Sequence, residues 1–92
     1  MVVDRAAVCS DWNARGFSCD LWVDSPGQVW ADFVHDSDEL VMLVEGEIEL
    51  SFSGRTLQPV AGEEVLIPAR NAHTVINTGR TTNRWLYGYR TR

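Results

Sequence analysis

Long hydrophobic runs are missing from this 92-residue sequence. No stretch approaches the ~18 consecutive apolar residues of a membrane-spanning helix. The first ten residues, MVVDRAAVCS, also lack the apolar core of ~7 to 15 residues that a signal peptide needs, because Asp4 and Arg5 interrupt them. The sequence therefore predicts neither a membrane span nor an export signal, and we expect a cytoplasmic protein.

Positive charge is also scarce. Eight Lys and Arg residues stand against thirteen Asp and Glu residues, which gives a formal net charge of -5 and a pI of about 4.8. A nucleic-acid-binding protein needs a basic face to neutralise phosphates. The arginines between residues 80 and 92 are interleaved with threonines and aromatic residues, a pattern typical of a solvated strand face. We therefore expect no nucleic-acid partner.

Only two cysteines are present, Cys9 and Cys19. Two cysteines cannot make a disulfide framework of the kind that small secreted domains use, and a reducing compartment would leave them as free thiols. Neither lies beside a histidine or a second cysteine at the spacing of metal ligands. We therefore expect free thiols without a catalytic or metal-binding role.

Short segments rich in β-branched and aromatic residues make up most of the chain. Turn signals separate them at 24–27, 45–47, 53–55, 59–62, 68–71 and 77–80. EIELSF (47–52) alternates like a half-buried strand, whereas LVMLV (40–44) is apolar throughout, like a strand covered on both faces. This spacing predicts one all-β domain over residues 1–92, a sandwich or small antiparallel barrel, with one short helix in the first fifteen residues.

Both histidines of the chain stand in spaced motifs. The first motif runs from Gly27 through Phe33, His35 and Glu39 to Gly46, and the second from Gly62 through Pro68 and His73 to Asn77. These spacings resemble the two motifs of the cupin family, of which the first has Gly, a His-x-His pair, Glu and Gly, and the second has Gly, Pro-x-Gly, His and Asn. The resemblance covers residues 27–77 and implies a small single-domain cupin, a double-stranded β-helix of the jelly-roll type.

The chain departs from the cupin motifs at two positions. Phe33 replaces the first histidine of the pair, and Arg70 replaces the glycine of Pro-x-Gly. The second departure is mild, because the positive backbone φ of that turn could shift to the neighbouring Asn71. The first departure removes one metal ligand of four and makes one wall of the site apolar.

The resemblance implies a metal site made by His35, Glu39 and His73. Two imidazoles and one carboxylate bind divalent transition metals such as Zn, Fe, Mn or Ni and leave coordination positions open for substrate or water. In the alternative, the loss of one ligand has cost the protein its metal, and the histidines are polar groups in a cavity. Glu39 would then be a buried carboxylate without a cation, which is costly.

Strand alternation predicts the lining of a small-molecule cavity. Residues in phase with the three candidate ligands are expected to face inward: Val29, Ala31, Phe33, Val41, Leu43, Val75 and Asn77. The other large aromatic residues are expected elsewhere, with Trp30 under an outer strand or at a subunit contact, and the core holding Trp22, Trp85, Tyr87 and Tyr89. The predicted cavity is mostly aliphatic, and Arg70 at its mouth is either a contact for an anionic substrate or a plain surface residue.

Three functions stay open from the sequence. A metal-dependent oxygenase, isomerase or lyase would act on a small polar or carboxylate-bearing compound, with the metal as Lewis acid or oxygen carrier. A ligand-binding or regulatory module would use the same cavity without metal or chemistry, and a stress or stability protein would need only the fold. Exposed strand edges and four tryptophans also predict a homodimer.

Overall fold

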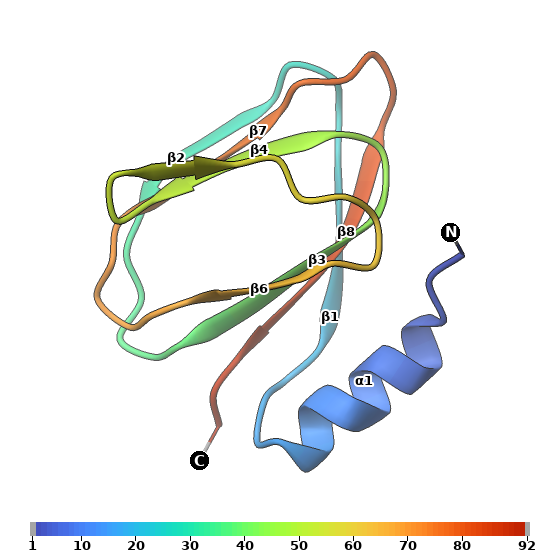
Figure 1. Cartoon of the computed structure of the whole chain (residues 1–92), viewed down its shortest axis with the longest axis vertical. Helices are drawn as coiled ribbons and strands as arrows, with labels where there is room; N and C mark the ends of the chain where they lie inside the picture. The colour runs from blue at the N-terminus through green and yellow to red at the C-terminus, as the bar shows by residue number, and fades with distance from the viewer. Residues whose placement is uncertain (1, 92) are drawn as a thin grey trace.

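The computed structural model describes residues 2–91, apart from the side chain of Asp32, as one helix and two four-stranded antiparallel sheets (Figure 1). In chain order the elements are α1 (Arg5–Ala14), β1 (Asp20–Asp24), β2 (Val29–Phe33), β3 (Glu39–Glu45), β4 (Ile48–Phe52), β5 (Arg55–Leu57), β6 (Glu64–Ile67), β7 (His73–Asn77) and β8 (Asn83–Tyr89). One sheet has the order β1-β8-β3-β6 and the other the order β2-β7-β4-β5. The all-β, jelly-roll-like barrel and the short N-terminal helix that the sequence predicts are confirmed.

Strand β3 shows how the sequence pattern makes the core. Its side chains alternate between two clusters: Val41 and Leu43 pack into the space between the sheets, and Leu40 and Met42 pack on the opposite face against α1. Both faces of the strand are therefore covered, as the unbroken apolar run predicts. On β4 only alternate residues are buried, because its second face meets solvent.

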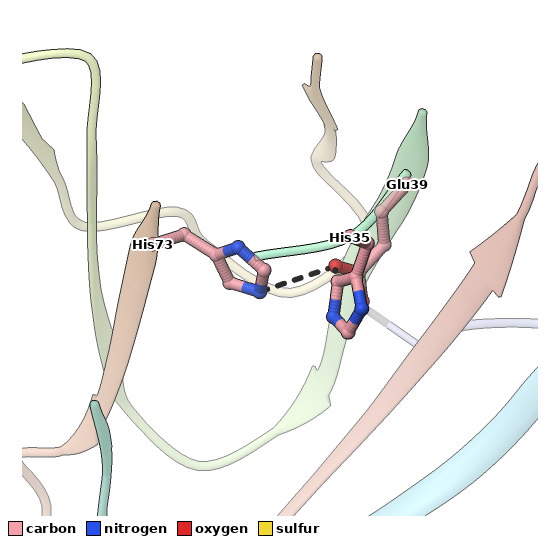
Figure 2. A group of neighbouring side chains, drawn as sticks. All are labelled: His35, Glu39 and His73. Carbon is pink, nitrogen blue, oxygen red and sulfur yellow. Dashed lines mark ion pairs between the residues drawn. The ribbon is translucent and has the colours of Figure 1, made fainter. Parts of the chain in front are cut away.

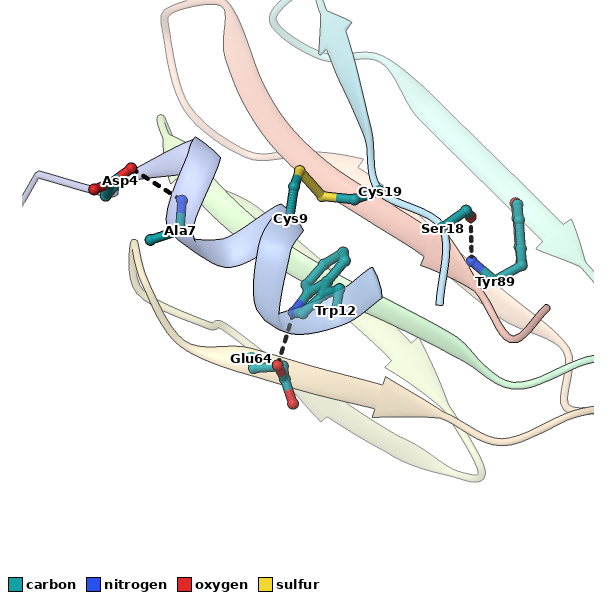
Figure 3. The surroundings of a disulfide bond; sticks show 8 residues. All are labelled: Asp4, Ala7, Cys9, Trp12, Ser18, Cys19, Glu64 and Tyr89. Atoms are coloured by element: carbon teal, nitrogen blue, oxygen red, sulfur yellow. Dashed lines mark hydrogen bonds between the residues drawn. A yellow bond between two sulfur atoms is a disulfide. The ribbon is translucent and has the colours of Figure 1, made fainter. Parts of the chain in front are cut away.

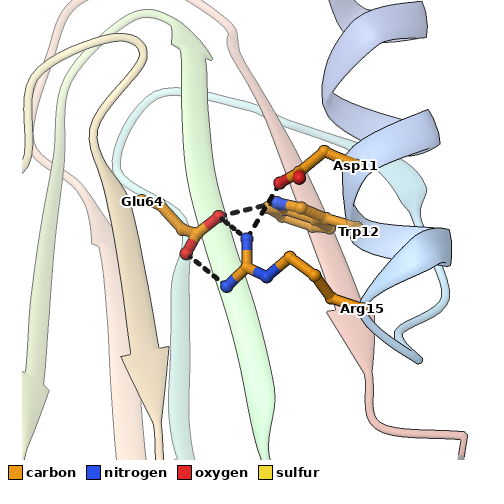
Figure 4. Close-up of polar contacts among 4 residues, drawn as sticks. All are labelled: Asp11, Trp12, Arg15 and Glu64. Carbon is orange, nitrogen blue, oxygen red and sulfur yellow. Dashed lines mark hydrogen bonds and ion pairs between the residues drawn. The ribbon is translucent and has the colours of Figure 1, made fainter.

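Helix α1 lies outside the β1-β8-β3-β6 sheet and covers it. Asp4 caps the helix by accepting a hydrogen bond from the backbone N–H of Ala7. Trp12 is fully buried against the sheet and donates its indole N–H to Glu64 at 2.9 Å. Arg15 makes a two-pronged contact with the same carboxylate at 2.8 and 2.9 Å (Figure 4). No helix among residues 2–91 has the length and apolarity to cross a membrane.

Cys9 and Cys19 form a disulfide, so the expectation of free thiols is wrong (Figure 3). Cys9 lies on α1 and Cys19 directly before β1, and the packing of the helix on the sheet brings their Cα atoms to 5.3 Å. Disulfides persist in oxidising compartments and are rare in the reducing cytosol. The bond therefore weighs against the cytoplasmic location expected from the sequence.

Removing this disulfide is expected to lower the free energy of unfolding by about 2–3 kcal/mol, because the bond limits the freedom of the unfolded chain. The variant is the double substitution Cys9→Ser and Cys19→Ser, compared with wild type by urea denaturation. Ser10→Ala, an exposed change on the same helix, is the control and should stay within about 0.5 kcal/mol of wild type. An unchanged unfolding midpoint in the double variant would show that the bond does not form in solution.

Candidate metal and ligand site

His35, Glu39 and His73 come together at one end of the space between the sheets (Figure 2). Glu39 begins β3 and His73 begins β7 of the opposite sheet, and these two side chains are buried, with exposed fractions of 4% and 5%. His35 lies between β2 and β3 and is half-buried. Each residue offers a ligand atom, and these atoms all lie within 4.8 Å of one another. The structure thus assembles the three residues that the cupin resemblance assigns to a metal site.

The Glu39 carboxylate is short of partners. Its Oε1 atom lies 3.3 Å from Nε2 of His73 and 3.8 Å from Nε2 of His35, yet it is buried and accepts no hydrogen bond. Burial raises the pKa of Glu39 to about 7, and burial also lowers the pKa of His73. Both groups therefore favour their neutral forms when no cation is bound.

The hydrogen bonds of the two histidines differ. Nδ1 of His73 lies 3.5 Å from the backbone oxygen of Asn71; a proton on Nδ1 would leave the Nε2 lone pair facing Glu39. Nε2 of His35 lies 3.2 Å from the hydroxyl of Tyr89, which can donate to it. Tyr89 is thus a site residue that the sequence did not reveal, because only the course of β8 brings it beside His35.

The donor set fits a divalent transition metal. Two imidazoles and a carboxylate are its usual nitrogen and oxygen ligands, and a cation would give the orphaned Oε1 atom of Glu39 its missing partner. Phe33 stacks on His35 with ring centroids 6.2 Å apart and an interplanar angle of 9°, and its ring lies 6.0 Å from that of His73. The residue in the position of the missing fourth ligand is therefore an apolar wall beside the other three.

The three residues lie at the end of a cavity of about 390 Å³. Its lining is chiefly aromatic, with Val41 and Val75 in addition to Trp22, Trp30, Phe33, Trp85, Tyr87 and Tyr89. The sequence predicted an aliphatic wall, which is wrong. It placed Trp22, Trp85, Tyr87 and Tyr89 in the core; Trp85 does belong to the core cluster, yet all four also line the cavity. The cause is β8: Trp85, Tyr87 and Tyr89 share the face of that strand that turns to the cavity.

With the geometry established, comparison with known proteins identifies the family. The family model described as a cupin domain matches residues 20–89. The chain is a cupin. No curated protein matches it.

Solved structures similar to this cupin share its fold. They include a cupin superfamily protein from Desulfitobacterium hafniense (TM-score 0.72, 17% identity, covering 83% of this chain and 68% of the other). A cupin 2 conserved barrel domain protein from Salinispora arenicola has a TM-score of 0.71 and 23% identity, with coverage of 80% and 62%. An oxalate oxidase in complex with glycolate has a TM-score of 0.75 and 23% identity, with coverage of 84% and 43%. This cupin therefore spans between 43% and 68% of the length of these chains.

An irregularity in β2 overturns part of the predicted lining. Trp30 pairs with Val75 and Phe33 with His73, so two residues of β2 stand opposite a single residue of β7 between these pairs. Such a bulge inverts the alternation of side chains. Trp30 and Phe33 consequently both face the cavity, whereas Val29 and Ala31 are exposed on the outside. The predictions that Val29 and Ala31 line the cavity and that Trp30 lies under an outer strand are wrong.

Leu43 and Asn77 are buried but do not line the cavity either. Leu43 belongs to the core between the sheets, farther along β3 from Glu39. The Asn77 amide donates to the backbone oxygen of Thr81 at 3.0 Å and to Asp24 at 3.3 Å, which fixes the turn between β7 and β8. Its buried amide is therefore structural, and the prediction of a lining role is wrong for both residues.

Asp24 is a further residue whose role the sequence did not reveal. It ends β1 with an exposed fraction of 3%, and its Oδ2 atom accepts the indole N–H of Trp30 and that of Trp85, each at 3.2 Å. The sequence showed only a turn residue here, because its two indole partners come from other strands. One buried carboxylate thus fixes two rings of the cavity wall.

Arg70 is exposed and does not line the cavity. It takes the positive φ of the turn itself, at 62°, so the expected shift to Asn71 is wrong. The reason is a backbone contact: the N–H of Arg70 donates to the oxygen of His35 at 2.7 Å and holds the turn in place. Its backbone therefore links the segment of His35 to the loop before His73.

The metal-free cupin is expected to lose stability as the pH rises from about 4.5 to 7. Burial raises the pKa of Glu39 from 4.5 in the unfolded chain to about 7 in the folded protein. The folded state therefore binds this proton more tightly. The resulting stabilisation is complete below pH 4.5 and is lost as the pH rises through 7. At pH 7.5 the free energy of unfolding of Glu39→Gln should exceed that of wild type by up to about 3 kcal/mol. Urea denaturation in chelator at several pH values measures this, with Glu49→Gln as the surface control.

Parallel pH profiles for wild type and Glu39→Gln would contradict this expectation. His73 contributes with the opposite sign, because its lowered pKa removes stability as the pH falls below about 6.5. Because His73 lies 3.3 Å from Glu39, the substitution also changes the surroundings of His73, so the two proteins are compared above pH 6.5, where His73 is neutral in both.

Proposed function

We propose that this cupin binds a divalent transition metal through His35, Glu39 and His73, at the end of a cavity that takes a small organic molecule. The observation that carries the proposal is the Oε1 atom of Glu39, buried without a hydrogen bond between two imidazole nitrogens. An uncompensated buried carboxylate costs several kcal/mol, and a cation at this point offsets the cost.

An enzymatic role as an oxygenase, isomerase or lyase is the finer proposal. A bound metal of this kind supplies Lewis-acid or redox chemistry. The chain's own residues would hold it from two sheets and one loop, and Phe33 would keep water from the position that lacks a ligand. The oxalate oxidase among the solved neighbours is in complex with glycolate, which supports testing carboxylate-bearing compounds as ligands.

A metal-free binding module is the second candidate, and two contacts favour it. Phe33 stands where the family has a ligand, and the Tyr89 hydroxyl lies within hydrogen-bond distance of His35 Nε2, a nitrogen that a metal would need. In this case the cavity would hold its ligand by contacts with the aromatic wall and with the polar groups at its His35 end, without a metal.

Metal content and metal-dependent melting decide between the two candidates. The protein is purified without an affinity tag or chelator, analysed for transition metals, and then melted with and without Zn, Mn and Ni. Near-stoichiometric metal and a melting temperature that rises with free metal support the proposal, because a ligand that binds only the folded state stabilises it. Absence of both would overturn it in favour of the metal-free module.

Phe33→His is expected to tighten metal binding by about tenfold or more, a gain of about 1.4 kcal/mol, because it restores the fourth ligand of the family motif. Phe33→Leu is the matched control, since leucine keeps the wall apolar and cannot bind a metal. Calorimetric titration with zinc gives both affinities. Equal affinities in the two variants would mean that position 33 does not point at the ion.

A further inference from the structure

Six of the rings that line the cavity form a closed circuit. Each ring contacts the next, with centroids 4.7 to 6.3 Å apart. We call this set the aromatic collar, and its members in order are His35, Phe33, Trp30, Trp22, Tyr87 and Tyr89, which returns to His35. The order places Trp22 opposite His35, three contacts away in either direction.

The collar offers faces and edges to a flat molecule. Trp22 meets Trp30 at 85° and Tyr87 at 80°, so neighbouring rings stand nearly perpendicular. A planar ligand can stack on one such ring while its edge meets another, and aromatic pairs prefer these two arrangements. All six collar rings remain partly exposed to solvent, so apolar surface at this opening is left for a ligand to cover.

The cavity wall is held in shape before any ligand arrives. Asp24 fixes the indoles of Trp30 and Trp85 from behind. A wall that is already ordered loses little conformational freedom on binding, which favours a rigid ligand over an induced fit.

Charge in the cavity is confined to the end at Glu39. No arginine among the described residues lines the cavity, and the sequence contains no lysine. A divalent ion held by the one carboxylate of Glu39 leaves that end with one net positive charge. The remaining collar residues offer no lysine or arginine to a second anionic group, so such a group inside the cavity would lose its hydration without gaining a partner.

We propose that the cavity binds small aromatic monocarboxylates, with the carboxylate at the metal end and the ring inside the aromatic collar. The inference rests on the proposed metal function and adds the class of ligand. It narrows the small polar or carboxylate-bearing compound expected from the sequence to an aromatic carboxylate, because the observed wall is aromatic.

A ligand series with the zinc-loaded protein tests this by calorimetric titration. Benzoate should bind at least about tenfold more tightly than glycolate or acetate, which lack an apolar body. It should also bind about 2- to 10-fold more tightly than cyclohexanecarboxylate, which has similar size but no π-system. Terephthalate, with a second carboxylate on the far side of the ring, should bind at least about tenfold more weakly than benzoate.

Variants of the collar locate the effect. Trp30→Leu should remove the preference for benzoate over cyclohexanecarboxylate while zinc affinity stays unchanged, and Trp22→Leu should do the same from the opposite side. Val60→Ala, at an exposed position outside the cavity, should keep the preference. Melting curves of each variant with zinc show that it is folded and loaded.

The outcomes separate the two proposals. Zinc uptake with glycolate bound as tightly as benzoate overturns the aromatic ligand and leaves the metal site standing. A second result would also overturn the aromatic ligand: the metal-free protein binds choline more tightly than the zinc-loaded protein binds benzoate. The aromatic collar would then be a binding site for a cation. A protein that takes up no zinc overturns the proposed function itself.

Discussion

Replacing His73 by alanine is expected to lower zinc affinity by more than about 100-fold. Even the loss of an outer partner of a metal ligand costs about 10- to 100-fold, and His73 would be one of only three ligands from the chain. At a free zinc concentration of about 100 times the wild-type Kd, zinc binding raises the free energy of unfolding of wild type by about 2.7 kcal/mol. It raises that of the variant by less than about 0.5 kcal/mol. In a domain of this size the difference is a melting shift of about 10 °C or more.

The His73 experiment has two controls. His35→Ala removes the second imidazole and should have a similar effect, whereas Glu49→Gln on β4 lies outside the group of candidate ligands and should leave the zinc shift intact. A full zinc shift in His73→Ala would place the ion somewhere other than between β3 and β7.

Trp12→Ala is expected to lower the free energy of unfolding by about 3–5 kcal/mol. Trp12 has an exposed fraction of 0%, fills the cluster between α1 and the sheet, and donates its indole N–H to Glu64. The substitution leaves a cavity between α1 and the sheet and removes this hydrogen bond. Urea denaturation measures the loss.

Trp12→Phe separates the two contributions to that loss. Phenylalanine keeps an aromatic ring but removes the indole donor, and Arg15 still binds Glu64, so a smaller loss is expected than for alanine. Wild-type stability in Trp12→Ala would mean that α1 is not docked on the sheet in solution.

The features that could be predicted from the sequence are those that depend on neighbouring residues and on motif spacing. The unbroken run of β3 and the alternation of β4 identified covered and half-covered strands, and motif spacing selected the two histidines and Glu39. The bulge in β2 could not be read, because it depends on pairing with β7 and reverses which side chains face inward. The disulfide was missed for a similar reason, since only the packing of α1 brings Cys9 to Cys19.

The sequence also could not predict the roles of residues whose partners come from several strands. Asp24 gained its role from the two indoles that meet it, and neither spacing nor composition links these residues. Three expectations stay predictions: that the protein forms a homodimer, that it has no nucleic-acid partner, and that residues 1–92 are one domain.

From Trp85 to Tyr89, strand β8 has no face that is open to solvent on its own. Its side chains alternate between Leu86 and Gly88, which pack beneath α1, and the aromatic residues that form the wall of the cavity. A Cβ atom at Gly88 would lie 1.9 Å from the backbone oxygen of Ser18, so even that position tolerates no side chain. A one-residue deletion would exchange the two faces and destroy both at once. The fold therefore depends on the length of this strand as strictly as on its composition.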